Sequence, residues 1–126
     1  MTDFSLVIPV YKNSEGIHDL VTRIHEMEIE FSKQKVSLEF VIVVDGSPDD
    51  SYQKLVGATW DRKVSKSIYL LDKNVGSALA IRFGLRHTTG KYSAIMSADL
   101  QEPLSLYLDI YAELSKNLYG LVLAAR

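Results

Sequence analysis

Two acidic side chains follow strand-like segments at separate places in the chain. Asp45 comes directly after the apolar run FVIVV, and Asp99 follows the run YSAIM after only two small residues. A carboxylate such as Asp45 can accept hydrogen bonds from the N–H of a base or from ribose hydroxyls. Asp99 and the amide of Gln101 offer hard oxygen ligands of the kind that hold Mg²⁺ or Mn²⁺ together with phosphates. These residue types suit a nucleotide that carries a diphosphate.

A simpler interpretation exists for both segments. The stretch DGSPD at 45–49 is also typical of a tight turn that caps the next helix, and we expect that role for Ser47 and Asp49. The stretch at 97–103 also fits a solvated turn in which Pro103 opens a helix. The order of strands and helices decides between the two interpretations.

Strand-like runs and helical patterns alternate along the chain. Near-continuous aliphatic and β-branched runs, typical of strands covered on both faces, occupy 4–10, 38–44, 67–71, 92–96 and 120–125. Helical patterns lie between them: from Ile17 to Phe31, around Leu55, Val56 and Trp60, from Val75 to Leu85, and after Pro103. Asn13 or Ser14 is expected to cap the first helix.

This alternation predicts a single α/β domain with a Rossmann-like, mostly parallel sheet and helices on both faces. In such sheets ligands bind at the carboxyl ends of the strands, where the strand order reverses. Asp45 and Asp99 are therefore expected on one edge. Tyr11 follows the first strand on the same edge, where its ring and the backbone at Pro9 offer a surface for a flat base.

Composition and motifs exclude several other classes. The chain has 126 residues, of which 47% are hydrophobic and 24% charged, and its net charge of −2 gives no basic field for nucleic acid. It has no cysteine and no apolar run near the ~20 residues of a membrane helix, so we expect a cytoplasmic protein. The turn PVYKNSEG lacks the glycines of a dinucleotide site, and no P-loop pattern occurs. A phospho-receiver would need acidic residues where Tyr11-Lys12 and Lys73-Asn74 stand.

The chain resembles, in four ordered segments, the donor-binding part of family 2 glycosyltransferases with the GT-A fold. The segments are SLVIPVYKNSEGI, FVIVVDGSPDDS, NVGSALAIRFGLRHTTGKY and IMSADLQEP, and they are closest to the polyprenyl-phosphate (dolichol-phosphate-type) transferases. The resemblance covers essentially all of the chain. It implies that 1–126 is the nucleotide-sugar-binding part of a longer domain that continues into an acceptor-binding half.

The resemblance also implies roles for single residues. The nucleoside would be held by Pro9, Tyr11, Val43 and Asp45, the ribose and diphosphate would lie at Ala98 and Asp99, and Arg126 would face the donor phosphates. Asp99 and Gln101 would bind the divalent metal, Mg²⁺ or Mn²⁺. Asn74 and Gly76 either line the base pocket or serve packing, and both interpretations stay open.

Three departures from the family pattern concern the site. Ser97 stands where the family's D-x-D has its first carboxylate, Val44-Asp45 replaces an aspartate pair, and Asn13 replaces a glutamate. Ser97 can still hydrogen-bond a hydroxyl or a metal-bound water. The loss of one charged oxygen is expected to weaken divalent-ion affinity.

The implied reaction is inverting transfer of a sugar from a UDP- or GDP-sugar to a polyprenyl phosphate or a glycan, in cell wall or polysaccharide biosynthesis. A phosphate acceptor needs no strong base, whereas a sugar hydroxyl does, and the sequence assigns no catalytic residue. Two alternatives stay open: a non-catalytic nucleotide-sugar-binding module, and a partner domain without a ligand. The 126-residue piece is expected to bind nucleotide with little or no transfer. Association with the inner face of a membrane is expected only through a part beyond Arg126.

Overall fold

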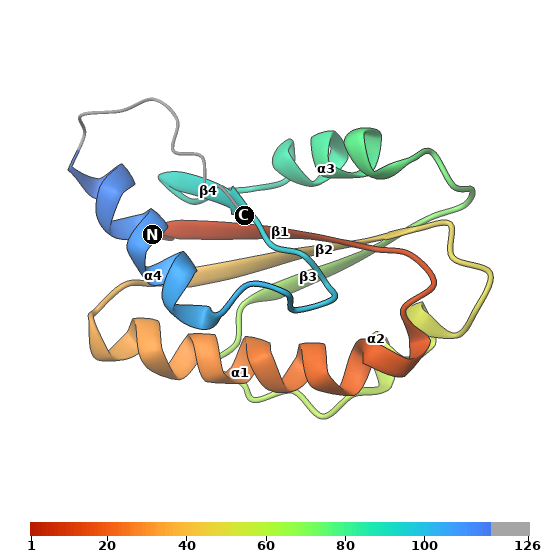
Figure 1. Cartoon of the computed structure of the whole chain (residues 1–126), viewed down its shortest axis with the longest axis horizontal. Helices are drawn as coiled ribbons and strands as arrows, with labels where there is room; N and C mark the ends of the chain where they lie inside the picture. The colour runs from red at the N-terminus through yellow and green to blue at the C-terminus, as the bar shows by residue number, and fades with distance from the viewer. Residues whose placement is uncertain (117–126) are drawn as a thin grey trace.

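The computed structural model describes residues 1–116, which form a four-stranded sheet between two layers of helices (Figure 1). The strands are β1 (Phe4–Val10), β2 (Leu38–Asp45), β3 (Lys66–Leu71) and β4 (Tyr92–Ile95). Their order is β3-β2-β1-β4, and all three pairings are parallel. The predicted Rossmann-like α/β class is confirmed. The strand expected at 120–125 lies outside the described residues.

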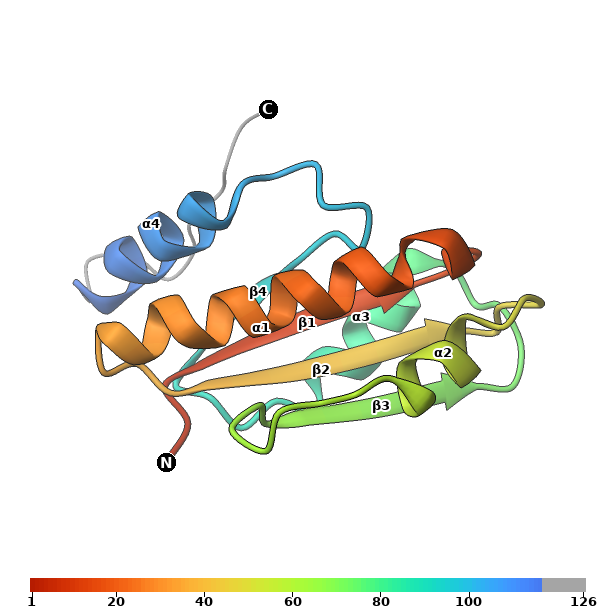
Figure 2. The same ribbon diagram turned by 90° about the horizontal axis from the view of Figure 1, so that it is seen from below.

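Three helices cover one face of the sheet and one covers the other (Figure 2). On the first face lie α1 (Ile17–Lys33), which follows the short 3₁₀ helix η1 (Ser14–Gly16), α2 (Ser51–Gly57) and α4 (Leu104–Ser115). On the second face lies α3 (Ser77–Leu85). Within residues 1–116 no helix is long and apolar enough to cross a membrane.

The larger core fills the space between α1 and the sheet. Apolar residues recur every three or four positions along α1, and all of them are at most 2% exposed: Ile17, Leu20, Ile24, Met27 and Phe31. They pack on fully buried strand residues such as Leu6 and Ile42. Each such side chain contributes about 1.5–3 kcal/mol on burial. The apolar stripe therefore determines which face of α1 meets the sheet.

The smaller core depends on a close approach of α3. Ala80 and Gly84 pack on Val7 and Val43. A Cβ atom at Gly84 would lie 2.5 Å from Cγ1 of Val7 and 3.2 Å from Cγ2 of Val43, so only glycine fits without displacing the strands.

A hydrogen-bonded clamp of Glu39, Ser5 and Thr89 lies at the amino ends of β1 and β2, which are called the amino edge below. Glu39 accepts bonds from the Ser5 hydroxyl at 2.6 Å and from the Thr89 amide and hydroxyl at 2.6 and 2.8 Å. The Ser5 oxygen in turn accepts the Gly90 amide at 2.8 Å. Burial favours the neutral form of Glu39, but the bonds from Ser5 and Thr89 outweigh it and hold the pKa of this carboxyl below its usual value. The clamp therefore ties the turn before β4 to β1 and β2.

Two helix predictions need correction. Trp60 lies beyond α2, because the chain becomes extended at Ala58. The Trp60 indole N–H instead donates to the Leu55 carbonyl at 2.9 Å. Val75 lies before α3, because Gly76 has a φ of +92° that no right-handed helix contains.

Candidate functional site

The carboxyl ends of the four strands lie on one edge of the sheet, because all pairings are parallel. Asp45 ends β2, and Asp99 lies in the loop that follows β4, so both share this edge as the topology predicts. Strand order reverses between β1 and β4. Ligands of open α/β sheets bind at such a reversal. The candidate site is therefore the edge that carries Tyr11 after β1 and Ser97 to Gln101 after β4.

Backbone conformations of positive φ occur in each of the four loops on this edge. They are found at Lys12 (49°), Gly46 (59°), Gly76 (92°) and Leu100 (59°). Gly46 also needs to be glycine for space, because a Cβ atom there would lie 2.2 Å from the backbone of Lys73 and Asn74. Lys12 and Leu100 carry side chains, for which this conformation is uncommon, and such residues are found preferentially at binding sites. A third such residue, Lys35, follows α1 at the other end of the sheet.

Asp45 joins the end of β2 to the loop before α3. Its side chain is 3% exposed, and its Oδ1 accepts the Val75 amide at 2.8 Å. Its Oδ2 accepts the Asn74 side-chain amide at 3.0 Å and the Gly76 amide at 3.1 Å. The visible role of Asp45 is therefore to hold the β3–α3 loop. The predicted contact between Asp45 and a nucleoside stays a prediction.

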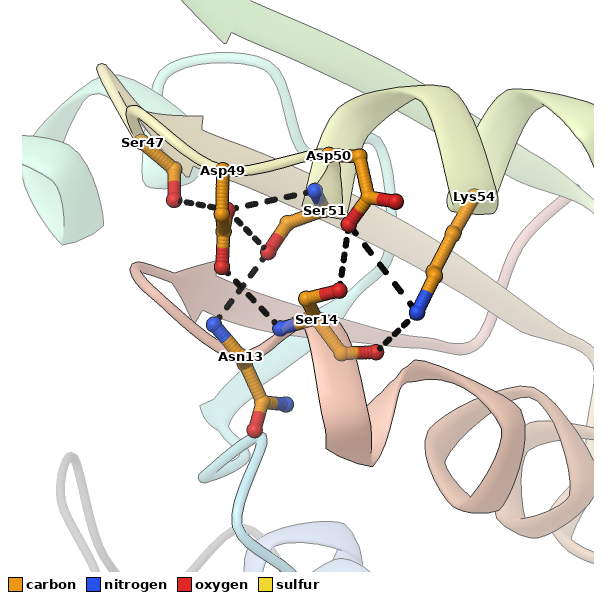
Figure 3. A network of polar contacts seen from close by, with 7 residues as sticks. All are labelled: Asn13, Ser14, Ser47, Asp49, Asp50, Ser51 and Lys54. Atoms are coloured by element: carbon orange, nitrogen blue, oxygen red, sulfur yellow. Dashed lines mark hydrogen bonds and ion pairs between the residues drawn. The ribbon is translucent and has the colours of Figure 1, made fainter.

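A second polar network joins the loops after β1 and β2 (Figure 3). Asp49 accepts the Ser47 hydroxyl at 2.5 Å, the Ser51 hydroxyl at 2.7 Å and the Ser14 amide at 3.2 Å. Ser51 in turn accepts the Asn13 amide at 3.2 Å. The bond from Ser47, supported by those from Ser51 and Ser14, lowers the pKa of Asp49 to about 2, so this carboxyl is charged at neutral pH.

The same network corrects a predicted helix cap. Neither Asn13 nor Ser14 caps the first helical turn with its side chain. The Ser14 amide is instead satisfied by Asp49 from the loop after β2. Lys54 of α2 adds a bond from its ammonium group to the Ser14 carbonyl at 3.1 Å. Ser47 and Asp49 were expected to form a turn that caps the next helix. The N-cap of α2 is instead Asp50, which makes no side-chain cap bond, and Asp49 accepts the Ser51 amide at 3.2 Å from one position earlier.

Asn13 links this network to the loop after β4. Its side-chain amide donates to the Ala98 carbonyl at 3.3 Å. Farther along α1, Nη1 of Arg23 donates to the Glu102 carbonyl at 3.0 Å. Sequence reasoning did not single out Arg23, because its partner lies 79 residues away and no local pattern indicates the contact.

Asp99 is exposed on the loop after β4. Its Oδ1 accepts the Ser97 hydroxyl at 2.5 Å and the Gln101 amide at 3.3 Å. Within the described residues, its Oδ2 makes no hydrogen bond. One carboxylate oxygen is thus left for a cation or a ligand.

Asp99 and Gln101 offer oxygen ligands for a divalent metal. Residues 1–116 contain no group of three or more His, Asp or Glu side chains that could hold a metal ion by themselves. Mg²⁺ is commonly bound through one or two carboxylates plus substrate phosphates, with water in the remaining positions. Asp99 therefore suits a metal ion that arrives with a diphosphate, and the side-chain oxygen of Gln101 is a second ligand of the right type.

The other predicted contacts differ in accessibility. The Tyr11 ring is 45% exposed, with the Lys12 ammonium 5.3 Å from its centre, and Pro9 is half-buried. Val43 is fully buried in the core beneath α3, so its visible role is packing. A Cβ atom at Gly76 would meet nothing within 4 Å. Arg126 lies outside the described residues.

A separate groove of about 820 Å³ lies between α1 and α2. It is lined by His18, Val21 and His25 on one side and by Gln53, Lys54 and Thr59 on the other. It contains neither of the acidic residues that point to nucleotide chemistry. We therefore place the candidate site at the strand edge, where the loops are bonded to one another.

Comparisons with known proteins agree with this fold. The sequence profile of the family Glycosyl transferase family 2 matches residues 5–126. The crystal structure of S. aureus TarS 1-349 superposes with a TM-score of 0.68 at 18% identity, over 98% of this chain and 39% of that chain. The same protein in complex with UDP-GlcNAc gives a TM-score of 0.64 at 16% identity, over 98% of this chain and 37% of that chain. The chain thus spans well under half of the TarS 1-349 chain, and at these identities the likeness is one of fold.

Proposed function

This chain belongs to glycosyl transferase family 2, and on that premise we propose that its strand edge binds the nucleotide-diphosphate sugar from which a glycosyl group is transferred. The observation that carries the proposal is that the loops after β1 and β4, which contain Tyr11 and Asp99, flank the reversal of strand order and are joined by the bond from Asn13 to the Ala98 carbonyl. The fold that this chain shares with TarS, whose structure contains UDP-GlcNAc, supports a UDP-sugar as one donor. A GDP-sugar is the other donor class to test.

The base would lie against Tyr11. A ring that is 45% exposed offers a flat face for stacking, and the nearby Lys12 ammonium adds positive charge. Asp45 would support this subsite mainly through the β3–α3 loop that it holds. Its Oδ1 accepts a single amide, so it has capacity for one more donor from a base or a ribose.

The diphosphate would lie at the loop after β4. Asp99 would bind Mg²⁺ or Mn²⁺ through its unbonded Oδ2, with Gln101 as a further oxygen ligand. The metal, once bound, would neutralise charge on the departing diphosphate. Ser97 would keep Asp99 oriented through its hydroxyl, in the place of a second charged ligand.

The acceptor would be a polyprenyl phosphate or a glycan, and the reaction would invert the anomeric carbon. A phosphate oxyanion attacks without a base, whereas a sugar hydroxyl needs one. Because the chain spans only 39% of the TarS 1-349 chain, we expect residues 1–126 alone to bind nucleotide but to transfer little sugar.

A second function is favoured by one observation. The hydroxyl of Ser97 donates to the carboxylate that would hold the metal, so the site has one charge where the family pattern has two. This arrangement also fits a module that binds a nucleotide sugar without catalysis.

Isothermal titration calorimetry tests the proposal and separates the two functions. UDP and GDP are titrated into the full chain with and without MnCl₂, and Asp99→Ala is compared with Asp109→Ala, an exposed aspartate on α4. We expect Mn²⁺ to strengthen nucleotide binding in the wild type and in Asp109→Ala but not in Asp99→Ala. Binding that ignores Mn²⁺ would favour the module, and absence of binding to either nucleotide would contradict both.

A further inference from the structure

The loop that carries Asp99 has little regular structure of its own. The last ladder bond of β4 runs from the Met96 amide to the Val7 carbonyl, and α4 begins only at Leu104. Between them a bond of 3.3 Å from the Leu100 amide to the Ser97 carbonyl closes a turn. Leu100 holds a φ of +59°, which is uncommon for a residue with a side chain. Contacts from outside the loop therefore add to the few bonds that hold it from within.

Two side chains from the segment after β1 supply such contacts, one near each end of the loop. Asn13 holds the Ala98 carbonyl at 3.3 Å, ahead of Asp99. Arg23 of α1 holds the Glu102 carbonyl at 3.0 Å, behind Gln101. The metal and diphosphate ligands of the proposed function lie between these two anchored carbonyls.

Arg23 is the stronger of the two anchors. The Arg23 side chain is 20% exposed and its donor is charged. Its hydrogen bond to the Glu102 carbonyl, at 3.0 Å, is shorter than the 3.3 Å bond from Asn13 to the Ala98 carbonyl. Hydrogen bonds from an ionised donor are stronger than those between neutral groups. Glu26, one turn along α1, lies 4.0 Å from the Arg23 Nε and helps to orient the guanidinium.

We infer that Arg23 is a positioning residue for the diphosphate: it fixes the loop of Asp99 and Gln101 in the binding conformation through the Glu102 carbonyl. The inference rests on the proposed function, because it assigns the loop a ligand. Without Arg23 the loop samples several conformations, and the apparent affinity falls in proportion to the fraction that is competent to bind. The base subsite at Tyr11 does not depend on this bond.

The test compares ligands with and without the diphosphate. UDP and uridine, and GDP and guanosine, are titrated in the presence of MnCl₂ into the wild type, Arg23→Ala, Arg23→Lys and the control Arg86→Ala, which removes an exposed arginine of the region after α3. We expect Arg23→Ala to weaken diphosphate binding roughly tenfold and to leave nucleoside binding unchanged. Arg23→Lys keeps a charged donor and should recover part of the loss, and Arg86→Ala should match the wild type.

Hydrogen exchange of the peptide spanning 96–103 gives a second readout that needs no ligand. We expect faster exchange there in Arg23→Ala than in Arg86→Ala, with unchanged exchange in β1 and β2. Arg23→Ala could also lower the melting temperature of the whole domain. In that case the ratio of diphosphate affinity to nucleoside affinity is measured on Arg23→Lys instead, at a temperature where this variant is fully folded.

The outcomes distinguish this inference from the function on which it rests. A wild-type chain that binds neither UDP nor GDP would overturn both. A wild type that binds a diphosphate, together with an Arg23→Ala variant of equal affinity and equal exchange at 96–103, would overturn the inference alone. An equal loss of affinity for nucleoside and nucleoside diphosphate in Arg23→Ala would also overturn the inference, because such a loss would indicate general damage to the fold.

Discussion

Ser97 determines how much negative charge the loop after β4 presents. Its hydroxyl donates to Oδ1 of Asp99 at 2.5 Å, so it uses one of the two carboxylate oxygens. An aspartate in this position would add a hard, charged ligand beside Asp99. It would also place two like charges close together, which is unfavourable unless a cation lies between them.

Ser97→Asp should therefore change nucleotide binding in opposite directions with and without metal. With MnCl₂ we expect roughly tenfold tighter binding of UDP or GDP, equivalent to about 1.4 kcal/mol. With EDTA we expect weaker binding than in the wild type. Ser105→Asp, an exposed position on α4, is the matched control and should show neither effect. Tighter binding of Ser97→Asp in EDTA would contradict this account.

The residue types of the site were predictable from sequence, but their partners were not. Asp45 was placed correctly at the end of a strand because the apolar run before it is unambiguous. Its carboxylate bonds reach 29 to 31 residues along the chain, to Asn74, Val75 and Gly76. No local pattern indicates contacts over that separation. The sequence therefore predicted a carboxylate that binds a ligand, whereas in the structure the Asp45 carboxylate already accepts three hydrogen bonds from the chain itself.

Helix α3 comes close to the sheet at Ala80 and Gly84, and the loop that Asp45 holds leads into this helix. In an exposed helix, replacing glycine by alanine stabilises by about 0.5–1 kcal/mol. At Gly84 the new methyl group would meet Val7 at 2.5 Å. Val7 is β-branched and fully buried, so it has little freedom to move away.

Gly84→Ala should consequently destabilise the protein by about 1–3 kcal/mol, as overpacked cores do. Gly57→Ala is the matched control, because no atom lies within 4 Å of a Cβ at the end of α2. It should be neutral or stabilising by about 0.5–1 kcal/mol. Urea unfolding of both variants checks the prediction, and a stabilised Gly84→Ala would show that α3 can move away from β1 at no cost.

Strand positions were predicted more accurately than helix ends. β1 matches its predicted bounds, and β2, β3 and β4 differ by one residue at one end each. Long apolar runs define strands because burial on both faces requires them. Helix ends depend on turn geometry instead: Trp60 fell outside α2 because the chain becomes extended after Gly57, and Val75 fell outside α3 because Gly76 adopts a positive φ.

The Glu39 clamp and the candidate site lie at opposite ends of the strands of one sheet. Glu39 closes the amino edge through Ser5 and Thr89, whereas Asp45 and the Asp49 network join the loops of the carboxyl edge. Glu39 and Asp45 lie six residues apart on β2, or roughly 20 Å at ~3.3 Å per residue. Changes this far apart are expected to have additive effects.

Glu39→Gln tests this separation. Its pKa is lowered in the folded state, so its charge stabilises the fold above the unfolded value of 4.5, and that stabilisation is lost as the pH falls below it. At pH 7 we expect the variant to lose about 1–2 kcal/mol of unfolding free energy, with the difference from the wild type shrinking towards pH 3. Nucleotide affinity should not change. Glu30→Gln, which removes a surface pair with Lys33, is the control and should cost less than about 1 kcal/mol at any pH.

The amino-edge clamp also has a consequence for how such a domain can diversify. Glu39, Ser5 and Thr89 stabilise the sheet far from the loops at the carboxyl ends of the strands. Residues in those loops can therefore change during evolution while this stabilising contact is kept. Under the proposed function, substitutions that change the preferred sugar or base would then carry few folding penalties. Relatives of this chain should accordingly differ in donor preference sooner than they differ in thermal tolerance.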